Sequence, residues 1–268
     1  MLQVIRILVY NNFIIKISWF LMEDVNNYWD NSKYQYCAYA ERLLKELTLL
    51  NTKVKQPIDM YEVKKGIYYA KKYHGSQMRQ SGEPYYSHPV EVAYMLAQYT
   101  SLEIPRLFRT DMIVTALLHD TIEDTQLTEK MIAYIFGSQV ASQVEDLTRV
   151  KPHGKISSAE TLDLLIQQKK YDVALIKLFD RIHNLETLGA KSPEKIRKIV
   201  QESMREFVII TMYLEIPQLT QKLLRLCYQY LSIITQSFPQ NQPLAFSKDT
   251  LLFSPTFQNE IAQMRTLG

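Results

Sequence analysis

The sequence predicts an all-helical fold, and three observations support that prediction. Apolar residues recur with a period near 3.6 from about residue 28 to residue 230, whereas the period-2 alternation of strands is scarce. Only 7 Gly and 10 Pro occur in 268 residues, too few turn residues for a hairpin-rich fold. Helix start and stop signals recur along the chain. We therefore expect a bundle of helices.

Capping residues and helix breakers divide the chain into predicted helices. Thr128 and Ser157 are expected N-caps, and Gly137 is expected to end a helix at its C′ position. Proline at the first helical position favours helix starts at Pro89 and Pro193. The predicted helices cover residues 61–73, 89–99, 107–124, 129–136, 158–169, 172–188, 193–215 and 218–236.

Four regions are expected along the chain. The apolar stretch 1–22 is interrupted by polar residues before a run of about 18 to 20 apolar residues accumulates, so we expect no membrane span. We interpret this stretch as a translated extension upstream of a functional start at Met22, and a cleaved signal or membrane anchor is the alternative. The regions are the extension (1–22), a main domain (23–217), a C-terminal helix packing on it (218–237) and a tail (238–268).

The composition excludes several classes of protein. With 47% hydrophobic residues, 22% charged residues and a net charge of +3, the chain is that of a globular protein without a polyanion-binding tail. Cys37 and Cys227 lie far apart with no CxxC partner, so they predict neither a disulfide framework nor a thiolate metal site. We expect a reducing, cytoplasmic compartment.

An acidic cluster ends the apolar helix predicted at 107–124. It holds His119, Asp120, Glu123 and Asp124, and carboxylates buried there without partners would be costly and would repel one another. A bound cation would relieve both penalties. His119 and Glu123 are four residues apart, as are Asp120 and Asp124, which predicts one pair that grips a metal and one that handles protons. A helix-end cluster satisfied by water is the alternative.

A second core-like helix carries a polar stripe, with Asp180, Asn184 and Thr187 at i, i+4 and i+7. His88 begins another helix, where the proline behind it holds the backbone rigid. Two imidazoles and two carboxylates from three helices predict a site for Mn²⁺, Fe²⁺, Mg²⁺ or Zn²⁺. For Asp180, a buried hydrogen-bond network or an ion pair with Arg181 is the alternative.

Four segments form a joint pattern of fixed order and spacing between about residues 61 and 219. They are 79–89 (RQSGEPYYSHP), 116–125 (ALLHDTIEDT), 135–150 with its FG and LTRV elements, and 177–188 (KLFDRIHNLETL). Together these segments resemble the HD-type hydrolase domain of the RelA/SpoT family of alarmone enzymes. The family's fold is all-helical, an HD-domain bundle with a metal site between core helices.

The resemblance implies a role for each of ten residues. The metal, Mn²⁺ in the family, would be bound by His88, His119, Asp120 and Asp180. The attacking water would be organised by Glu123 and Asp124, the guanine base held by Arg79 and Ser81, and the ribose and phosphates faced by Asn184 and Thr187.

The resemblance also implies an activity. We expect a Mn²⁺-dependent enzyme of the stringent response that hydrolyses the 3′-pyrophosphate of guanosine tetra- or pentaphosphate to GDP or GTP and pyrophosphate. The alternatives are a related phosphohydrolase acting on another 2′- or 3′-phosphorylated nucleotide and an inactive alarmone-binding domain. We expect no nucleic-acid partner and no stable membrane insertion. The residues after Pro217 are too few for the family's synthetase domain.

Two departures from the family pattern remove positive charge near a highly anionic substrate. Gln80 stands where members commonly carry Lys, and Glu186 stands where they commonly carry Arg. We expect these changes to affect affinity more than chemistry. The loop from Arg149 to Lys155 is the expected source of further phosphate-facing cations, and a solvated basic loop is the alternative.

Overall fold

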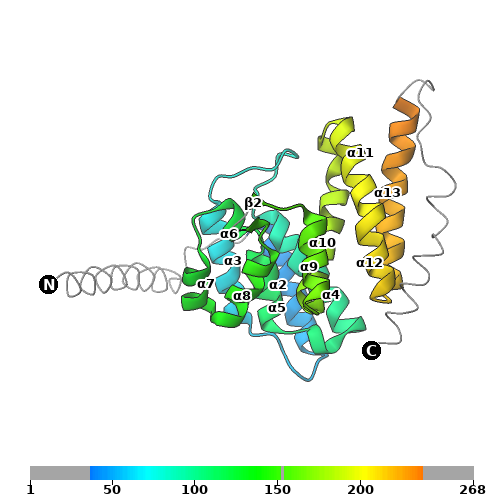
Figure 1. Ribbon diagram of the computed structural model, residues 1–268. Helices are drawn as coiled ribbons and strands as arrows, with labels where there is room; N and C mark the ends of the chain where they lie inside the picture. Colours follow the sequence, from blue (N-terminus) through cyan, green and yellow to red (C-terminus); the bar gives the residue numbers. More distant parts are fainter. Residues whose placement is uncertain (1–36, 152–153, 238–268) are drawn as a thin grey trace. The chain divides into compact units, whose positions relative to one another are not determined.

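A computed structural model of the protein describes residues 37–151 and 154–237 (Figure 1). The predicted extension at 1–22 and the predicted tail at 238–268 lie outside these residues. The described chain is helical apart from one short ribbon, so the predicted all-helical class is confirmed. It forms two compact units that divide between His183 and Asn184, and the predicted boundary at residue 217 lies inside the second.

The elements of the first unit follow in chain order. They are α2 (Ala38–Asn51), α3 (Met60–His74), α4 (Ser87–Glu103), η1 (Pro105–Leu107), α5 (Thr110–Leu118), α6 (Thr121–Asp124), α7 (Glu129–Phe136), α8 (Ser138–Leu147), β1 (Val150–Lys151), β2 (Gly154–Lys155), α9 (Ser158–Gln167) and α10 (Tyr171–Glu186). Helix α10 runs across the boundary between the units.

Several helix ends form as the sequence predicts. The Thr128 hydroxyl accepts a hydrogen bond from the backbone N–H of Met131 and so caps α7. Ser157 and Glu160 form a reciprocal capping box at the start of α9. Gly137 ends α7 with a φ of 91°, a conformation that favours glycine, and it also precedes the first residue of α8.

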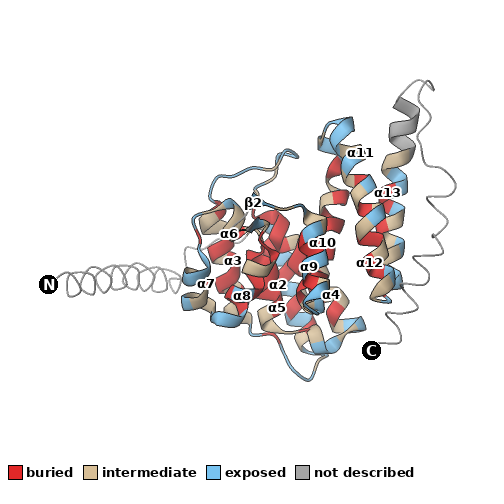
Figure 2. Ribbon diagram, in the orientation of Figure 1, coloured by how far each residue is buried: buried red, intermediate tan, exposed pale blue. Residues whose placement is uncertain are grey.

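Helix α5 is the central element of the first unit. Its residues from Met112 to Leu118 are all buried, as expected of a helix that is apolar on every side. Helices α3, α4 and α8 pack around it, and buried residues gather in the interior of the unit (Figure 2). Gly66 lets α3 approach closely, since a Cβ there would lie 3.0 Å from Cδ1 of Leu117. This packing fixes the position of the polar residues that follow Leu118.

The single helix predicted over 107–124 is wrong, because the helix starts at Thr110 and is interrupted at His119 and Asp120, between α5 and α6. The His119 ring lies 2.8 Å from the carbonyl oxygen of Ala116, and the Thr121 hydroxyl donates to the carbonyl of Leu118 at 2.7 Å. These side-chain bonds take carbonyls that the helical ladder would otherwise use. The break places His119 and Asp120 at the end of a buried helix.

A two-stranded antiparallel ribbon lies within the basic loop 149–155. Val150 pairs with Lys155, and Lys151 pairs with Gly154. The sequence predicts only a loop here, because strands of two residues are too short to show a period-2 pattern. Gly154 has a φ of 122°, which a residue with a side chain would adopt only with strain.

The second unit is a helical hairpin with one irregular arm. Its elements are η2 (Leu188–Ala190), α11 (Pro193–Glu202), η3 (Ser203–Phe207), α12 (Val208–Tyr213) and α13 (Pro217–Ser237). The helix predicted over 193–215 is interrupted by the π-helical η3, where the buried Ser203 hydroxyl donates to the carbonyl of Ile199 at 2.7 Å. Helix α13 packs against α11 and α12. Across the described residues, no helix combines the length and hydropathy that a membrane crossing requires.

Candidate metal centre

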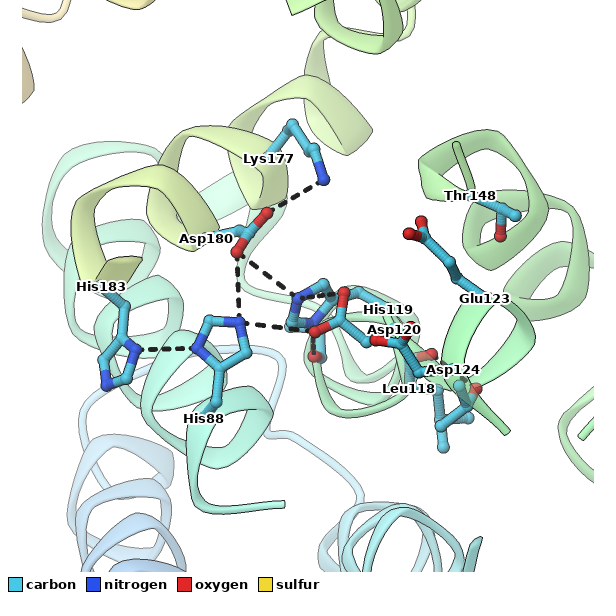
Figure 3. Close-up of polar contacts among 12 residues, drawn as sticks. His88, Leu118, His119, Asp120, Glu123, Asp124, Thr148, Lys177, Asp180 and His183 are labelled. Carbon is cyan, nitrogen blue, oxygen red and sulfur yellow. Dashed lines mark hydrogen bonds and ion pairs between the residues drawn. The ribbon is translucent and has the colours of Figure 1, made fainter. Parts of the chain in front are cut away.

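Three elements of the first unit bring four predicted ligand residues together. His88 lies at the start of α4, His119 and Asp120 follow α5, and Asp180 lies on α10 (Figure 3). Nε2 of His88 is 3.1 Å from Oδ1 of Asp180, and Nε2 of His119 is 3.1 Å from Oδ1 of Asp120. One ligand atom each from His88, His119 and Asp180 lie within 4.8 Å of one another.

The cluster is buried on three of its four sides. The side chains of His88, His119 and Asp180 are at most 8% exposed, whereas that of Asp120 is 18% exposed. Asp120 also approaches His88, at 3.5 Å between Oδ2 and Nε2. Two carboxylates and two imidazoles thus share one small volume with little access to water.

His119 has its Nε2 directed at the carboxylates of Asp120 and Asp180. Its Nδ1 lies 2.8 Å from the carbonyl oxygen of Ala116, so Nδ1 carries the hydrogen and donates it. Its Nε2 is buried and has no hydrogen-bond partner within the described ranges, although Asp120 and Asp180 lie 3.1 and 3.8 Å away. A nitrogen that faces two anions is stabilised by a cation, either its own proton or a metal ion that replaces the proton, so this donor set fits a divalent metal ion.

The pKa shifts within the cluster also show that positive charge is favoured there. Burial alone would lower the pKa of His119, but Asp120 and Asp180 outweigh it and raise the pKa to about 10. Burial alone would raise the pKa of Asp120 and of Asp180. The histidines hold the pKa of Asp120 below its ordinary value, and Lys177 together with the histidines holds that of Asp180 well below.

Two residues that contact the cluster are absent from the sequence prediction. Nδ1 of His183 lies 2.7 Å from Nδ1 of His88, and Nζ of Lys177 lies 2.9 Å from Oδ2 of Asp180. Burial, followed by the His88 and Arg79 charges, lowers the pKa of His183 to about 3, so its ring is neutral. Both residues lie three positions from Asp180 on α10, a spacing that places them on its side of the helix.

Asp124 is held from outside the cluster. The Tyr85 hydroxyl donates to Oδ2 of Asp124 at 2.8 Å and lies 3.3 Å from Oδ2 of Asp120. Gln77 donates to the backbone carbonyl of Asp124 at 3.0 Å, and the buried His74 ring stacks on Tyr85. Asp124 is itself exposed, so one of its faces is open to water. Tyr85 lies in the segment 79–89, and its contact with Asp124 was not predicted from the sequence.

Glu123 lies apart from the cluster, and its pairing with His119 through i,i+4 spacing is wrong. No dashed contact in Figure 3 joins Glu123 to the His and Asp residues. Its carboxylate instead contacts Arg149 at 2.5 Å and Lys155 at 2.7 Å. The break after Leu118 explains the difference, because spacing arguments hold only within one continuous helix.

The four residues predicted to bind substrate lie in two parts of the chain. Arg79 and Ser81 lie in the loop between α3 and α4, where Arg79 is half-buried and Ser81 exposed. The Arg79 charge is one cause of the lowered pKa of His183, so this loop lies beside the cluster. Asn184 and Thr187 belong to the second unit, at the end of α10 and directly after it, and their contacts to substrate stay a prediction.

Comparison with known proteins agrees with the sequence resemblance. "GTP pyrophosphokinase rsh" of Brucella ovis is 37% identical over 174 residues, covering 63% of this chain and 22% of that protein. "Guanosine-3′,5′-bis(diphosphate) 3′-pyrophosphohydrolase" of Aquifex aeolicus is 36% identical over 173 residues, covering 63% and 24%. The chain thus spans less than a quarter of the length of these relatives.

A solved structure and a family model complete the comparison. The structure, described as a metazoan ortholog of SpoT that hydrolyzes ppGpp and plays a role in starvation responses, aligns with a TM-score of 0.46 at 22% identity. That alignment covers 63% of this chain and 94% of the other. The model described as an HD domain matches residues 66–210, more than half of the chain, and the chain therefore belongs to the HD domain family.

Proposed function

We propose that the protein hydrolyses the 3′-pyrophosphate of guanosine tetra- or pentaphosphate, giving GDP or GTP and pyrophosphate, with Mn²⁺ as its metal. The observation that carries the proposal is the convergence of the buried Nε2 of His119 and two carboxylates on one point. The name of the Aquifex aeolicus relative supports the reaction, since it states hydrolysis at this position of the nucleotide. We place the activity in the cytoplasm, within the stringent response.

The ion would be held by His88, His119, Asp120 and Asp180. Nitrogen and carboxylate oxygen donors without a thiolate suit Mn²⁺ better than a soft metal. When bound, the ion lowers the pKa of a coordinated water and polarises a phosphoryl oxygen. Lys177 and His183 keep Asp180 and His88 in place, as residues behind metal ligands commonly do.

The remaining predicted residues would handle water and nucleotide. Asp124 offers an exposed carboxylate that can accept a proton from the attacking water, while Tyr85 holds it in place. The Arg79 guanidinium would stack on the guanine base and Ser81 would bond its edge. Asn184 and Thr187 would contact the ribose and phosphates.

The test is product release from purified protein supplied with Mn²⁺ or with EDTA. Guanosine tetraphosphate should yield GDP and pyrophosphate with Mn²⁺, and EDTA should abolish the release. A panel that includes guanosine pentaphosphate and a 3′-phosphorylated adenine dinucleotide examines the alternative substrate. Turnover of the dinucleotide alone would replace the guanosine substrate, and nucleotide binding without turnover of any compound would refute the hydrolase.

A further inference from the structure

A second polar cluster joins α6 to the β1–β2 ribbon, beside the metal centre but separate from it. It consists of Glu123, Arg149 and Lys155, and the Glu123 side chain is only 6% exposed. Oε2 of Glu123 accepts from the backbone N–H and from Nε of Arg149, each at 3.2 Å. Oε1 accepts from Nη2 of Arg149 at 2.5 Å and from Nζ of Lys155 at 2.7 Å.

These contacts fill the acceptor capacity of the carboxylate. An ionised carboxylate has about four lone-pair sites, two on each oxygen, and Glu123 uses two on each. Burial would raise the pKa of Glu123, but Arg149 and Lys155 outweigh it and lower the pKa. In this arrangement Glu123 is a fixed anion with no site left to take a proton from water.

Arg149 holds the carboxylate more firmly than Lys155 does. Arg149 uses a rigid guanidinium fork and a backbone N–H, so three of the four contacts come from one residue. Its own backbone is set by the ribbon, because its carbonyl accepts from the N–H of Ile156 at 2.9 Å. Lys155 supplies one contact from a side chain that is 55% exposed.

We infer that Arg149 is a positioning residue that acts through Glu123 to fix α6, and with it the orientation of Asp124. Helix α6 has four residues and follows a break, so it needs side-chain contacts to hold its place. Glu123 is held by Arg149, and Asp124 is held by Tyr85. The inference rests on the proposed function, in which Asp124 faces the attacking water. It differs from the expectation that this loop supplies phosphate-binding cations.

A double-mutant cycle tests the inference. The variants are Arg149→Gln, Glu123→Gln and the pair together, assayed for kcat and KM on guanosine tetraphosphate with Mn²⁺. Arg149→Gln should lower kcat about 10 to 100-fold with less than about a threefold change in KM, the scale expected on losing charge-assisted bonds to a buried carboxylate. Adding Arg149→Gln to Glu123→Gln should cost no more than about a further twofold.

Matched variants separate position from charge. Lys155→Gln removes the same charge but one contact, so its loss of kcat should be smaller than that of Arg149→Gln. Arg149→Lys keeps the charge without the fork, should fold if Arg149→Gln does not, and should recover part of the lost kcat. Lys170→Gln breaks an ion pair with Asp146 elsewhere on the first unit and should leave kcat unchanged.

Binding without turnover provides a second measurement. The dissociation constant of guanosine tetraphosphate for the EDTA-treated protein should be the same for wild type and Arg149→Gln, whether or not the metal-loaded enzyme is active. If Arg149→Gln has a larger dissociation constant and a larger KM than wild type with an unchanged kcat, Arg149 contacts phosphate, and the inference is overturned. Losses of kcat that multiply in the double variant would overturn it as well.

The wild-type protein separates failure of the inference from failure of the proposed function. If it releases no product from any nucleotide, the proposed function and the inference that rests on it are both refuted. If it turns over guanosine tetraphosphate and the cycle shows no coupling between positions 123 and 149, the inference alone is refuted.

Discussion

A single hydrogen bond from the His119 ring to a backbone carbonyl determines what this residue can do. Because Nδ1 donates to the carbonyl of Ala116, the other nitrogen faces the cluster and can bind a metal ion once its proton is displaced. The hydrogen bond uses the carbonyl of Ala116, which would otherwise be available to the helix, and it orients Nε2 of His119 as a ligand atom. The chemistry of the centre and the break after α5 therefore have one cause.

Substituting Tyr85 tests how Asp124 is held. Tyr85→Phe removes the 2.8 Å hydrogen bond to Oδ2 of Asp124 and leaves the ring stacked on His74. We expect kcat to fall about 5 to 10-fold, since one neutral donor contributes about 1 kcal/mol. Tyr94→Phe, which removes a hydroxyl bonded to Gln98 elsewhere on α4, is the control. Equal kcat values for Tyr85→Phe and wild type would show that Asp124 needs no donor.

At the residue scale, the sequence predicts the four residues of the cluster but not the residues that hold them in place. The joint pattern of four segments predicts His88, His119, Asp120 and Asp180, and the structure brings them together. His183 and Lys177 stand in a quoted segment without an assigned role, because their contacts depend on how α4 meets α10. No local spacing encodes that meeting.

Among the elements, α5 is tied to its neighbours by a polar network at its first turn. Asp111 accepts two hydrogen bonds from Arg109 and one each from Gln139 and Gln143, and Arg109 also reaches Asp172. The network thus links α5 with α8 and α10. Burial would raise the pKa of Asp111, but its bonds from Arg109 and Gln143 outweigh burial and lower the pKa.

The sign of that pKa shift gives a pH-dependent prediction. A carboxyl whose pKa is lower in the folded state stabilises the fold above its ordinary pKa near 4, and this contribution disappears as the pH falls through the folded value. Asp111→Asn should therefore lower the free energy of unfolding by about 1 kcal/mol at pH 7 and by much less at pH 3. Urea unfolding at both pH values measures the difference.

Asp163 provides the opposite case for the same measurement. Partial desolvation of this exposed side chain and the nearby Glu160 raise the pKa of Asp163, so Asp163→Asn should not lower the free energy of unfolding at pH 7. A cost for Asp111→Asn that is equal at pH 3 and pH 7 would show that packing, and not ionisation, carries its effect.

Some element boundaries followed the sequence, whereas α4 begins at Ser87, two residues before the predicted start at Pro89. Thr128, Ser157 and Gly137 act as predicted, because capping depends on residues a few positions apart. The break after Leu118 was not predicted, since polar residues at i,i+4 spacing continue through it and the competing bonds come from side chains that also suit a helix. The ribbon at Val150 was missed because each strand is too short to show a pattern.

For the whole molecule, metal binding and folding are linked. Mn²⁺ at 100 times its Kd should raise the free energy of unfolding by about 2.7 kcal/mol, or about 5 to 10 °C in Tm for a protein of this size. The ion would also relieve the repulsion between Asp120 and Asp180 that the metal-free cluster carries. Thermal unfolding with Mn²⁺ and with EDTA measures the shift.

Asp180→Ala is the critical variant for that shift. It removes one proposed ligand, so Mn²⁺ should no longer raise Tm and the bound metal content should fall. Asp163→Ala, which removes an exposed carboxylate on α9, should keep the full shift. An Asp180→Ala protein that holds stoichiometric Mn²⁺ would contradict the ligand assignment.

The uneven burial of the cluster has a consequence for the rate at which an ion enters and leaves. His88, His119 and Asp180 lie in the interior, while the Asp120 side chain reaches solvent at 18% exposure. Exchange with the bulk should therefore pass Asp120, which would be the first group to engage an incoming ion and the last to release a departing one. Changes near Asp120 should alter the residence time of the ion, whereas changes on the buried side should alter whether it is retained at all.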